Sequence, residues 1–330
     1  MLGGIVDLGN EAGRQALKSG FGTLAEIGQA PRAPTPLLPP PDLSGVPRLV
    51  ERLPLDAPIP AIPGASAYRT QMAPDQTFAA VYANELSHVP RLRIADLPDG
   101  EYVARVRGVD PNGLEGFSTD QPITIHARPE PPVLVDPAPD AGLTVARPTL
   151  RWAEGTSKAS YHVQISTSAK FETPLADVPA LAANTLQLAE DLAPGVYYWR
   201  VSTIDTAQGQ GPFSDAQSFR RLLPGPGIDP PKLDGDQLTL RWLAAGNGAS
   251  YHLQLARDEN FQQPFVDEVL SEAQYALKKP APGSYFLRVN AISADGFAGP
   301  WGATQTLSIP DRPPPVWRAL LILIPVLLAL

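Results

Sequence analysis

Histidine is the residue type in this chain best suited to metal binding or proton transfer, and four are present: His88, His126, His162 and His252. His162 and His252 each follow a tyrosine within two copies of a repeated pattern, as a repeated metal or ligand site would require. However, neither has a carboxylate or a second histidine at metal-ligand spacing. A repeated polar strand face explains the two positions more simply, so the sequence predicts no metal site and no cofactor.

Arginine recurs three residues after a tyrosine, at Arg105, Arg200 and Arg288. In a strand whose tyrosine points inward, these arginines would point outward. They could form a basic ladder for an acidic ligand, or stack over neighbouring aromatic rings such as Tyr198. The structural role is the favoured interpretation.

Two turns have the oxygen-rich composition of calcium loops, namely residues 110–113 (Asp-Pro-Asn-Gly) and 294–296 (Ala-Asp-Gly). Both fall where an antiparallel sheet needs a hairpin connection. Asp, Asn, Pro and Gly are also the residues that such turns prefer. The sequence therefore favours turns over calcium sites at both places.

Three aromatic residues are the candidate ligand contacts: Phe117, Phe213 and Trp301. Each follows a glycine-containing turn near the end of its copy. They could cap a sheet edge, seal neighbouring domains, or contact a glycan or a protein, and we rank these roles in that order. No Ser-His-Asp order, paired catalytic carboxylates, HExxH, P-loop or GxGxxG pattern rises above chance, so the sequence predicts a protein that is not an enzyme.

These residues belong to a pattern that occurs three times. The pairs Tyr68–Phe78, Tyr161–Phe171 and Tyr251–Phe261 share one spacing of ten residues, and successive copies start about ninety residues apart. In the second copy, Leu150 and Trp152 share one face of a short strand, and Tyr161, Val163 and Ile165 share one face of the next. Several short strands separated by turns within such a length are typical of an antiparallel sandwich. The predicted structural core contains Tyr102, Trp152, Tyr161, Tyr197, Trp242, Tyr251 and Tyr285.

The composition excludes several partners and chemistries. The formal net charge is −8 and there is no basic run, which argues against a nucleic-acid partner. The chain has no cysteine, and therefore no disulfide, zinc-thiolate site or thiol nucleophile. Proline reaches 39 residues, and the proline-rich stretch 31–54 is predicted to be an extended linker.

The copies resemble fibronectin type III domains. Residues 97–102, 192–197 and 280–285 each place Pro-x-Gly or Pro-Gly before a tyrosine, similar to the tyrosine corner of that family. Trp152 and Trp242 are similar to its buried tryptophan, whereas the first copy has Ile59-Pro60 at that place. The resemblance implies three tandem fibronectin-III or immunoglobulin-like antiparallel β-sandwiches, at residues 55–128, 129–223 and 224–310.

The first thirty residues carry a second resemblance. Asn10-Glu-Ala-Gly13 and the run Ser19–Pro31, followed by the proline-rich linker and the repeats, are similar to the end of the FecR domain in bacterial envelope proteins. The resemblance implies that residues 1–30 are a partial FecR-like β segment and that this is a C-terminal part of such a protein. The signal peptide would then have been lost with a missing N-terminal part.

The C-terminal segment 311–330 ends in twelve uncharged, mostly apolar residues, Ala319–Leu330. As a helix they would rise roughly 18 Å, short of the roughly 30 Å hydrocarbon core of a bilayer. Trp317 and Arg318 precede them, where interfacial anchors usually lie. We therefore expect a short apolar helix that associates with the membrane.

Taken together, these features predict a non-catalytic structural, interaction or signalling-associated protein of the bacterial cell envelope, membrane-associated on the periplasmic side. Its partner would be a protein or an envelope polysaccharide, with membrane contact through residues 319–330. The alternative is an array that binds carbohydrate or peptidoglycan, in which several weak sites gain avidity.

Overall fold

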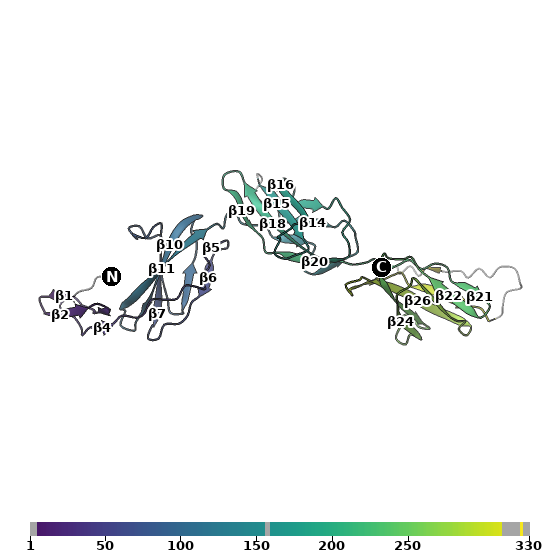
Figure 1. The fold of residues 1–330 in the computed structure, drawn as a ribbon, viewed down its shortest axis with the longest axis horizontal. Helices are drawn as coiled ribbons and strands as arrows, with labels where there is room; N and C mark the ends of the chain where they lie inside the picture. Colours follow the sequence, from purple (N-terminus) through teal and green to yellow (C-terminus); the bar gives the residue numbers. More distant parts are fainter. Residues whose placement is uncertain (1–4, 156–158, 312–323, 326–330) are drawn as a thin grey trace. The chain divides into compact units, whose positions relative to one another are not determined.

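The computed structural model describes residues 5–155, 159–311 and 324–325, and every regular element within them is a β-strand (Figure 1). The predicted all-β class is confirmed. The chain divides into two compact units, Met1–Pro131 with Thr203–Pro212, and Pro132–Ser202 with Phe213–Leu330. Each copy of the repeat forms a sandwich with a hydrophobic core of its own.

The N-terminal residues form two small antiparallel pairs. One pairs β1 (Ile5–Asn10) with β2 (Gly13–Lys18), and the other pairs β3 (Phe21–Gly22) with β4 (Thr35–Pro36). Val6, Leu8 and Phe21 are exposed, so these pairs bury little apolar surface of their own. Two-stranded pairs of this kind gain stability mainly from what they pack against.

The first sandwich packs a five-stranded sheet against a two-stranded one. The larger sheet has the order β5-β11-β10-β7-β8. Its strands are β5 (Leu49–Val50), β7 (Ala67–Ala73), β8 (Ala83–Ser87), β10 (Gly100–Val109) and β11 (Glu115–Ile125). The smaller sheet pairs β6 (Leu55–Pro58) with β9 (Arg91–Ile94). Ile59 is buried nine residues before Tyr68, the spacing that separates Trp152 from Tyr161.

The packing of this first sandwich begins inside the segment predicted to be a linker. Leu43, Val46 and Val50 are buried in its core, and β5 pairs in parallel with β11. The amide of Thr124 also donates to the carbonyl of Arg48 over 2.7 Å. Isolated apolar residues within a proline-rich stretch therefore complete the hydrophobic core, although the composition alone indicates a linker.

The second sandwich contains a three-stranded and a larger sheet. The smaller sheet has the order β12-β14-β17, with β12 (Leu134–Asp136), β14 (Thr149–Trp152) and β17 (Thr185–Gln187). The larger has the order β13-β20-β18-β15-β16, with β19 paired to β18. Its strands are β13 (Ala141–Leu143), β15 (Ser160–Ser166), β16 (Ala176–Leu181), β18 (Gly195–Asp205), β19 (Gly209–Phe213) and β20 (Gln217–Arg221).

The third sandwich repeats this plan. Its smaller sheet has the order β21-β22-β25, with β21 (Lys232–Asp234), β22 (Gln237–Arg241) and β25 (Gln274–Lys278). The larger has the order β24-β23-β26-β28-β29, with β27 paired to β26. Its strands are β23 (Ser250–Ala256), β24 (Val266–Leu270), β26 (Gly283–Ile292), β27 (Ala298–Trp301), β28 (Gln305–Ile309) and β29 (Ile324–Pro325).

Most of the predicted apolar tail, residues 311–330, lies outside the described residues. Ile324 and Pro325 are described, and they form strand β29, antiparallel to Gln305 and Thr306 of β28, where a helix was expected. Among the described residues, no helix has the length and apolar character needed to cross a bilayer.

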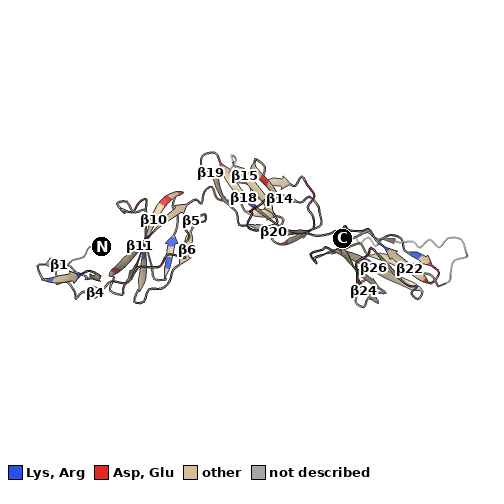
Figure 2. Cartoon of the chain, viewed as in Figure 1, with Lys and Arg blue, Asp and Glu red and all other residues tan. Residues whose placement is uncertain are grey.

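The seven aromatic residues predicted as core are all buried. Trp152 is the most enclosed of them, at 1% exposure, followed by Tyr161 and Tyr285 at 2% each. Charged residues of both signs are instead scattered along the strands and turns (Figure 2). This distribution leaves few places where polar side chains gather, and the clearest of these lie on the outer faces of the larger sheets.

Candidate functional site

The outer face of the larger sheet in the third sandwich carries a cluster built around Arg288. Leu287 and Val289 are fully buried in the core, so the alternation of strand β26 directs Arg288 outward. Arg288 pairs with Gln254 of β23 in the strand register. Its Nε and Nη2 both donate to the Gln254 side-chain oxygen, over 2.8 and 2.6 Å. The guanidinium plane is thereby fixed over the sheet.

Aromatic rings enclose this guanidinium. The Arg288 Cζ atom lies 4.0 Å from the ring centroid of Phe261 and 4.3 Å from that of Trp301. His252 lies beside the same indole, with ring centroids 4.9 Å apart. Burial lowers the pKa of Arg288, and the nearby Asp267 opposes that shift. We call His252, Gln254, Phe261, Arg288 and Trp301 the third stack.

The second sandwich holds the same arrangement, which we call the second stack: His162, Gln164, Phe171, Arg200 and Phe213. Arg200 Nε and Nη2 donate to the Gln164 side-chain oxygen over 2.9 and 2.7 Å. Its Cζ atom is 4.2 Å from the ring centroid of Phe171 and 4.2 Å from that of Phe213. His162 lies 4.9 Å from Phe213, centroid to centroid. The two stacks differ mainly in their second aromatic ring, which is the phenyl ring of Phe213 in one and the indole of Trp301 in the other.

The first sandwich has a reduced version. Arg105 lies over Phe78, with Cζ 3.7 Å from the ring centroid. Its guanidinium makes a bidentate contact with Asp120, over 2.7 and 2.6 Å, which raises the pKa of Arg105. Phe117 remains 47% exposed, so its ring is the most accessible of the three candidate aromatics. The arginines stack on aromatic rings, as the structural interpretation expected. The ring present in all three copies, here called the inner ring, is the phenylalanine of the repeat (Phe78, Phe171 or Phe261) and not Tyr198.

The inner phenylalanines have an uncommon backbone. Phe78, Phe171 and Phe261 have φ values of 53°, 55° and 54°, in the left-handed region that bulky residues rarely adopt. Each follows a tight turn in which its amide donates to the carbonyl three residues earlier. This conformation places the ring beneath the arginine, a relationship that sequence spacing alone does not reveal.

Each outward histidine has a carboxylate partner from the neighbouring strand. His162 Nε2 is hydrogen-bonded to Asp177, and His252 Nε2 to Asp267. The hydrogen bond from His252 is the main cause of a lowered pKa for Asp267. His88 and His126 lie apart from these pairs, beside the Ser66 carbonyl and Asp99. Within the described part of the chain, no three His, Cys, Asp or Glu residues gather as a metal site would need.

The two calcium-like loops are hairpin turns. The Asp110 carboxylate accepts hydrogen bonds from the amides of Asn112 and Leu114, both over 2.8 Å. Gly113 and Gly296 have φ values of 89° and 84°, which glycine adopts without strain. The oxygen-rich composition is therefore used to close the turns.

The tyrosines of each copy form two repeated hydrogen bonds. In the tyrosine corner, Tyr102, Tyr197 and Tyr285 donate to carbonyls four residues earlier, over 3.0, 2.9 and 2.6 Å. A second set, unforeseen from the sequence, accepts from amides six residues earlier. These are Tyr68, Tyr161 and Tyr251, with distances of 2.8, 2.7 and 2.9 Å. Both sets fix loops to the sandwich core.

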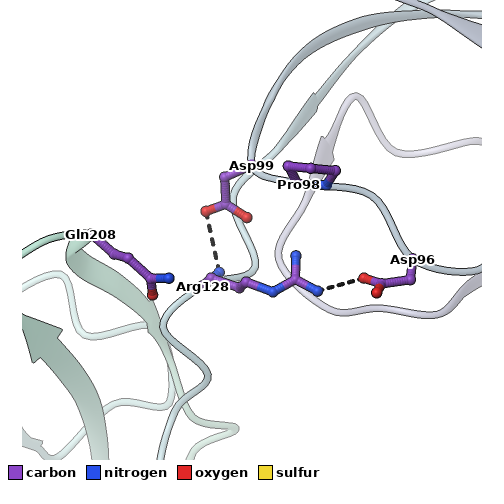
Figure 3. Close-up of a pocket in the computed structure, with 5 residues that line it drawn as sticks. All are labelled: Asp96, Pro98, Asp99, Arg128 and Gln208. Atoms are coloured by element: carbon purple, nitrogen blue, oxygen red, sulfur yellow. Dashed lines mark hydrogen bonds and ion pairs between the residues drawn. The ribbon is translucent and has the colours of Figure 1, made fainter. Parts of the chain in front are cut away.

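A hollow of about 370 Å³ in the first unit is lined by Asp96, Pro98, Asp99, Arg128 and Gln208 (Figure 3). Its charged groups satisfy one another. Arg128 pairs with Asp96, which raises the pKa of Arg128, and also donates to the Leu97 carbonyl over 2.8 Å. Asp99 accepts from the amides of Ala127 and Arg128, over 3.0 and 3.2 Å. These contacts hold residues 127–128 against the tyrosine-corner loop.

The sheet order, the tyrosine corners and the buried tryptophans define tandem β-sandwiches of the fibronectin type III kind. No protein-family profile matches the chain, and no curated protein matches it either. Among solved structures, the chain is similar to a two-domain fibronectin type III segment of chicken tenascin, at 15% identity and a TM-score of 0.39. That match covers 54% of this chain and 99% of the tenascin segment. It is also similar to the FN1–FN3 domains of chicken CNTN1, at 15% identity and a TM-score of 0.24, covering 74% of this chain and 94% of the other.

Proposed function

We propose that this chain is a non-catalytic structural and interaction protein of the bacterial cell envelope, related to the FecR family and associated with envelope signalling. Its sandwiches set a distance and present surface to a protein or an envelope polysaccharide. The observation that carries the proposal is the set of contacts that the repeated polar residues make. The arginines, tyrosines and histidines of the pattern all make contacts within their own sandwiches.

Further support comes from the way each stack completes the outer face of its sheet. Asn290 lies on that face between His252 and Trp301 in the strand register, and it is only 6% exposed. The stacks therefore cover polar groups of the central strands and hold the short strands β19 and β27 in place. Surfaces built in this way suit a rigid spacer better than a reaction centre.

The cellular location rests on the FecR resemblance of residues 1–30 and on the apolar segment 319–330. The test is fractionation of the protein in the bacterium that encodes it, with and without residues 319–330. We expect the intact protein in the membrane pellet, and the shortened one in the periplasmic fraction. Recovery of both from the cytosol would refute the envelope role, and equal sedimentation of both would refute anchoring through this segment.

A carbohydrate- or peptidoglycan-binding array is a second candidate, favoured by the accessible ring of Phe117 and the partly exposed rings of Phe213 and Trp301. Aromatic faces of this kind can stack on sugar rings, and several weak sites gain avidity. The protein would be incubated with insoluble peptidoglycan, beside a Phe117→Ala variant and a Leu243→Ala control at another exposed apolar residue. Retention that only Phe117→Ala reduces would support this candidate, and no retention of the unchanged protein would exclude it.

A further inference from the structure

The third sandwich contains an open cavity of about 670 Å³ beside its tyrosine corner, lined by residues other than those of the third stack. It lies where strand β24 begins, strand β25 ends and strand β26 begins. Its volume is within the range of about 300–1,000 Å³ that is usual for small-molecule sites. The lining combines an apolar floor with charged residues, and both parts bear on what it could bind.

The floor is an ordered aromatic pair. Phe265 and Tyr285 meet edge to face, with ring centroids 5.4 Å apart and an interplanar angle of 65°. The hydrogen bond from the Tyr285 hydroxyl to the Ala281 carbonyl fixes the tyrosine ring. Phe265 nevertheless remains 48% exposed, which leaves an apolar face open to a ligand. Leu277 extends this floor.

Two cations line the same cavity. Arg257 donates from Nη2 to the Tyr285 hydroxyl over 3.0 Å, and its Cζ atom lies 5.2 Å from the centroid of that ring. Lys278 lies at the end of β25. Among the described residues, no carboxylate forms a salt bridge with either cation, whereas Arg105 and Arg151 each pair with an aspartate. Asp258 is the one carboxylate of the described lining, and it accepts from the Gln262 amide over 2.9 Å.

The second sandwich has a cavity at the corresponding place with the opposite charge. It measures about 420 Å³ and is lined by Leu175, in the position of Phe265, and by Tyr197 of the tyrosine corner. Its charged lining residues are Glu190 and Asp191, and Asp191 pairs with Arg147 over 2.6 Å. Beside a tyrosine that both copies share, the same architecture thus carries cations and Phe265 in one copy, and carboxylates and Leu175 in the other.

We propose that the cavity of the third sandwich binds a carboxylate carried on an apolar or aromatic group. Phe265 and Leu277 contact the apolar body above the buried ring of Tyr285, while Arg257 and Lys278 bind the carboxylate through charge-assisted hydrogen bonds. Such a group occurs in small organic acids and at the end of a peptide with an apolar last residue. This site is independent of where in the cell the protein acts.

Ligand-observed NMR titration of the full chain tests the proposal with three probes. These are 3-phenylpropionate for a small acid, N-acetylphenylalanine for a peptide end, and N-acetylphenylalanine amide as the uncharged control. We expect saturable binding of at least one acid, and affinity for the amide at least tenfold lower. Binding of one acid alone would identify its source as the small acid or the peptide end. Absence of binding by both acids, or equal binding of acid and amide, would overturn the proposal.

Variants assign the binding to this cavity. We expect Lys278→Gln and Phe265→Ala to weaken acid binding at least tenfold. Both side chains are exposed and neither holds the core, so both variants should still fold. Lys279→Gln is the matched control. Lys279 is the next residue after Lys278 in the chain, and its backbone amide donates a hydrogen bond to the Asp236 carbonyl. Unchanged melting temperatures would show that both cavity variants fold. Equal affinity in all the variants would place the binding elsewhere and overturn the assignment.

Discussion

The guanidinium carbon of Arg288 lies 4.3 Å from the centroid of the Trp301 indole. Arg288 comes from the central strand β26 and Trp301 from the short strand β27, so the contact joins the end of the repeat to the middle of its sheet. The equivalent pair in the second sandwich is Arg200 and Phe213, at 4.2 Å. Trp301, one of the candidate ligand contacts, therefore packs over the outer face of its own sheet.

This contact predicts the effect of removing the indole. Trp301→Ala should destabilise the third sandwich by about 1–3 kcal/mol, since it removes both the cation–π contact and partly buried apolar area. Trp301→Phe should cost less, because Phe213 already fills this place in the second stack. Differential scanning calorimetry of the full chain measures both. The control is Leu243→Ala at an exposed side chain, expected to change stability by less than about 0.5 kcal/mol. An equal shift from the control would contradict the role given to Trp301.

Trp152 provides the corresponding test of the second core. It is 1% exposed and meets Tyr161 at 5.3 Å between ring centroids, at an angle of 70°. Trp152→Ala should cost about 3–5 kcal/mol, because the cavity left by a buried tryptophan adds to the lost transfer free energy. Urea unfolding monitored by circular dichroism would detect the loss, with Val145→Ala as an exposed control. A midpoint unchanged by Trp152→Ala would show that the side chain does not hold the core.

The tyrosine corner predicts a pH dependence. Burial raises the pKa of Tyr197 above its usual value of 10.0, so the folded protein holds this proton more tightly than the unfolded chain. The resulting stability is present below pH 10.0 and is lost as the pH rises through the folded-state pKa. Tyr197→Phe should remove the hydrogen bond to Ala193, at about 1 kcal/mol near neutral pH, and make the alkaline decline shallower. Melting temperatures between pH 8 and pH 11 would compare the two proteins. Parallel curves would show that this hydroxyl does not contribute.

The sequence was sufficient for features that depend on local spacing. The corner at Tyr102, Tyr197 and Tyr285 spans four residues, so its glycine and tyrosine could be recognised without the fold. The partners of His162 and His252 could not, because Asp177 and Asp267 come from strands whose register is set by tertiary packing. Leu43 was missed for another reason. A proline-rich composition indicates an extended chain, but it does not show which apolar residues in that chain are covered.

Arg288 has one feature that the sequence predicts and another that depends on tertiary structure. Its outward direction followed from strand alternation, and stacking over an aromatic ring was one of two roles considered. The ring itself was not foreseen, since Phe261 reaches Arg288 only through a left-handed backbone at φ 54°. The cavity beside Phe265 was also unforeseen, because Arg257, Phe265 and Lys278 lie next to the ends of three different strands and share no motif with the tyrosine corner.

The last prediction concerns glycines that allow the leading segment of a sandwich to run close to its final hairpin. A Cβ atom on Gly299 would lie far inside van der Waals contact with the carbonyl oxygen of Leu223, a residue buried in the third core. A Cβ atom on Gly116 would likewise lie only 2.6 Å from the carbonyl oxygen of Leu38. Gly299→Ala should therefore displace backbone and cost about 1–3 kcal/mol, as overpacking does.

Gly227 supplies the matched control for this substitution. A Cβ atom there would meet no atom within 4 Å, and its φ lies outside the left-handed region. Gly227→Ala should therefore leave stability unchanged or raise it by up to about 1 kcal/mol, because alanine restricts the unfolded chain. Thermal unfolding of the two variants separates steric exclusion from a general loss of glycine flexibility. If both substitutions lower the melting temperature equally, the close approach of Leu223 to Gly299 is not what requires glycine.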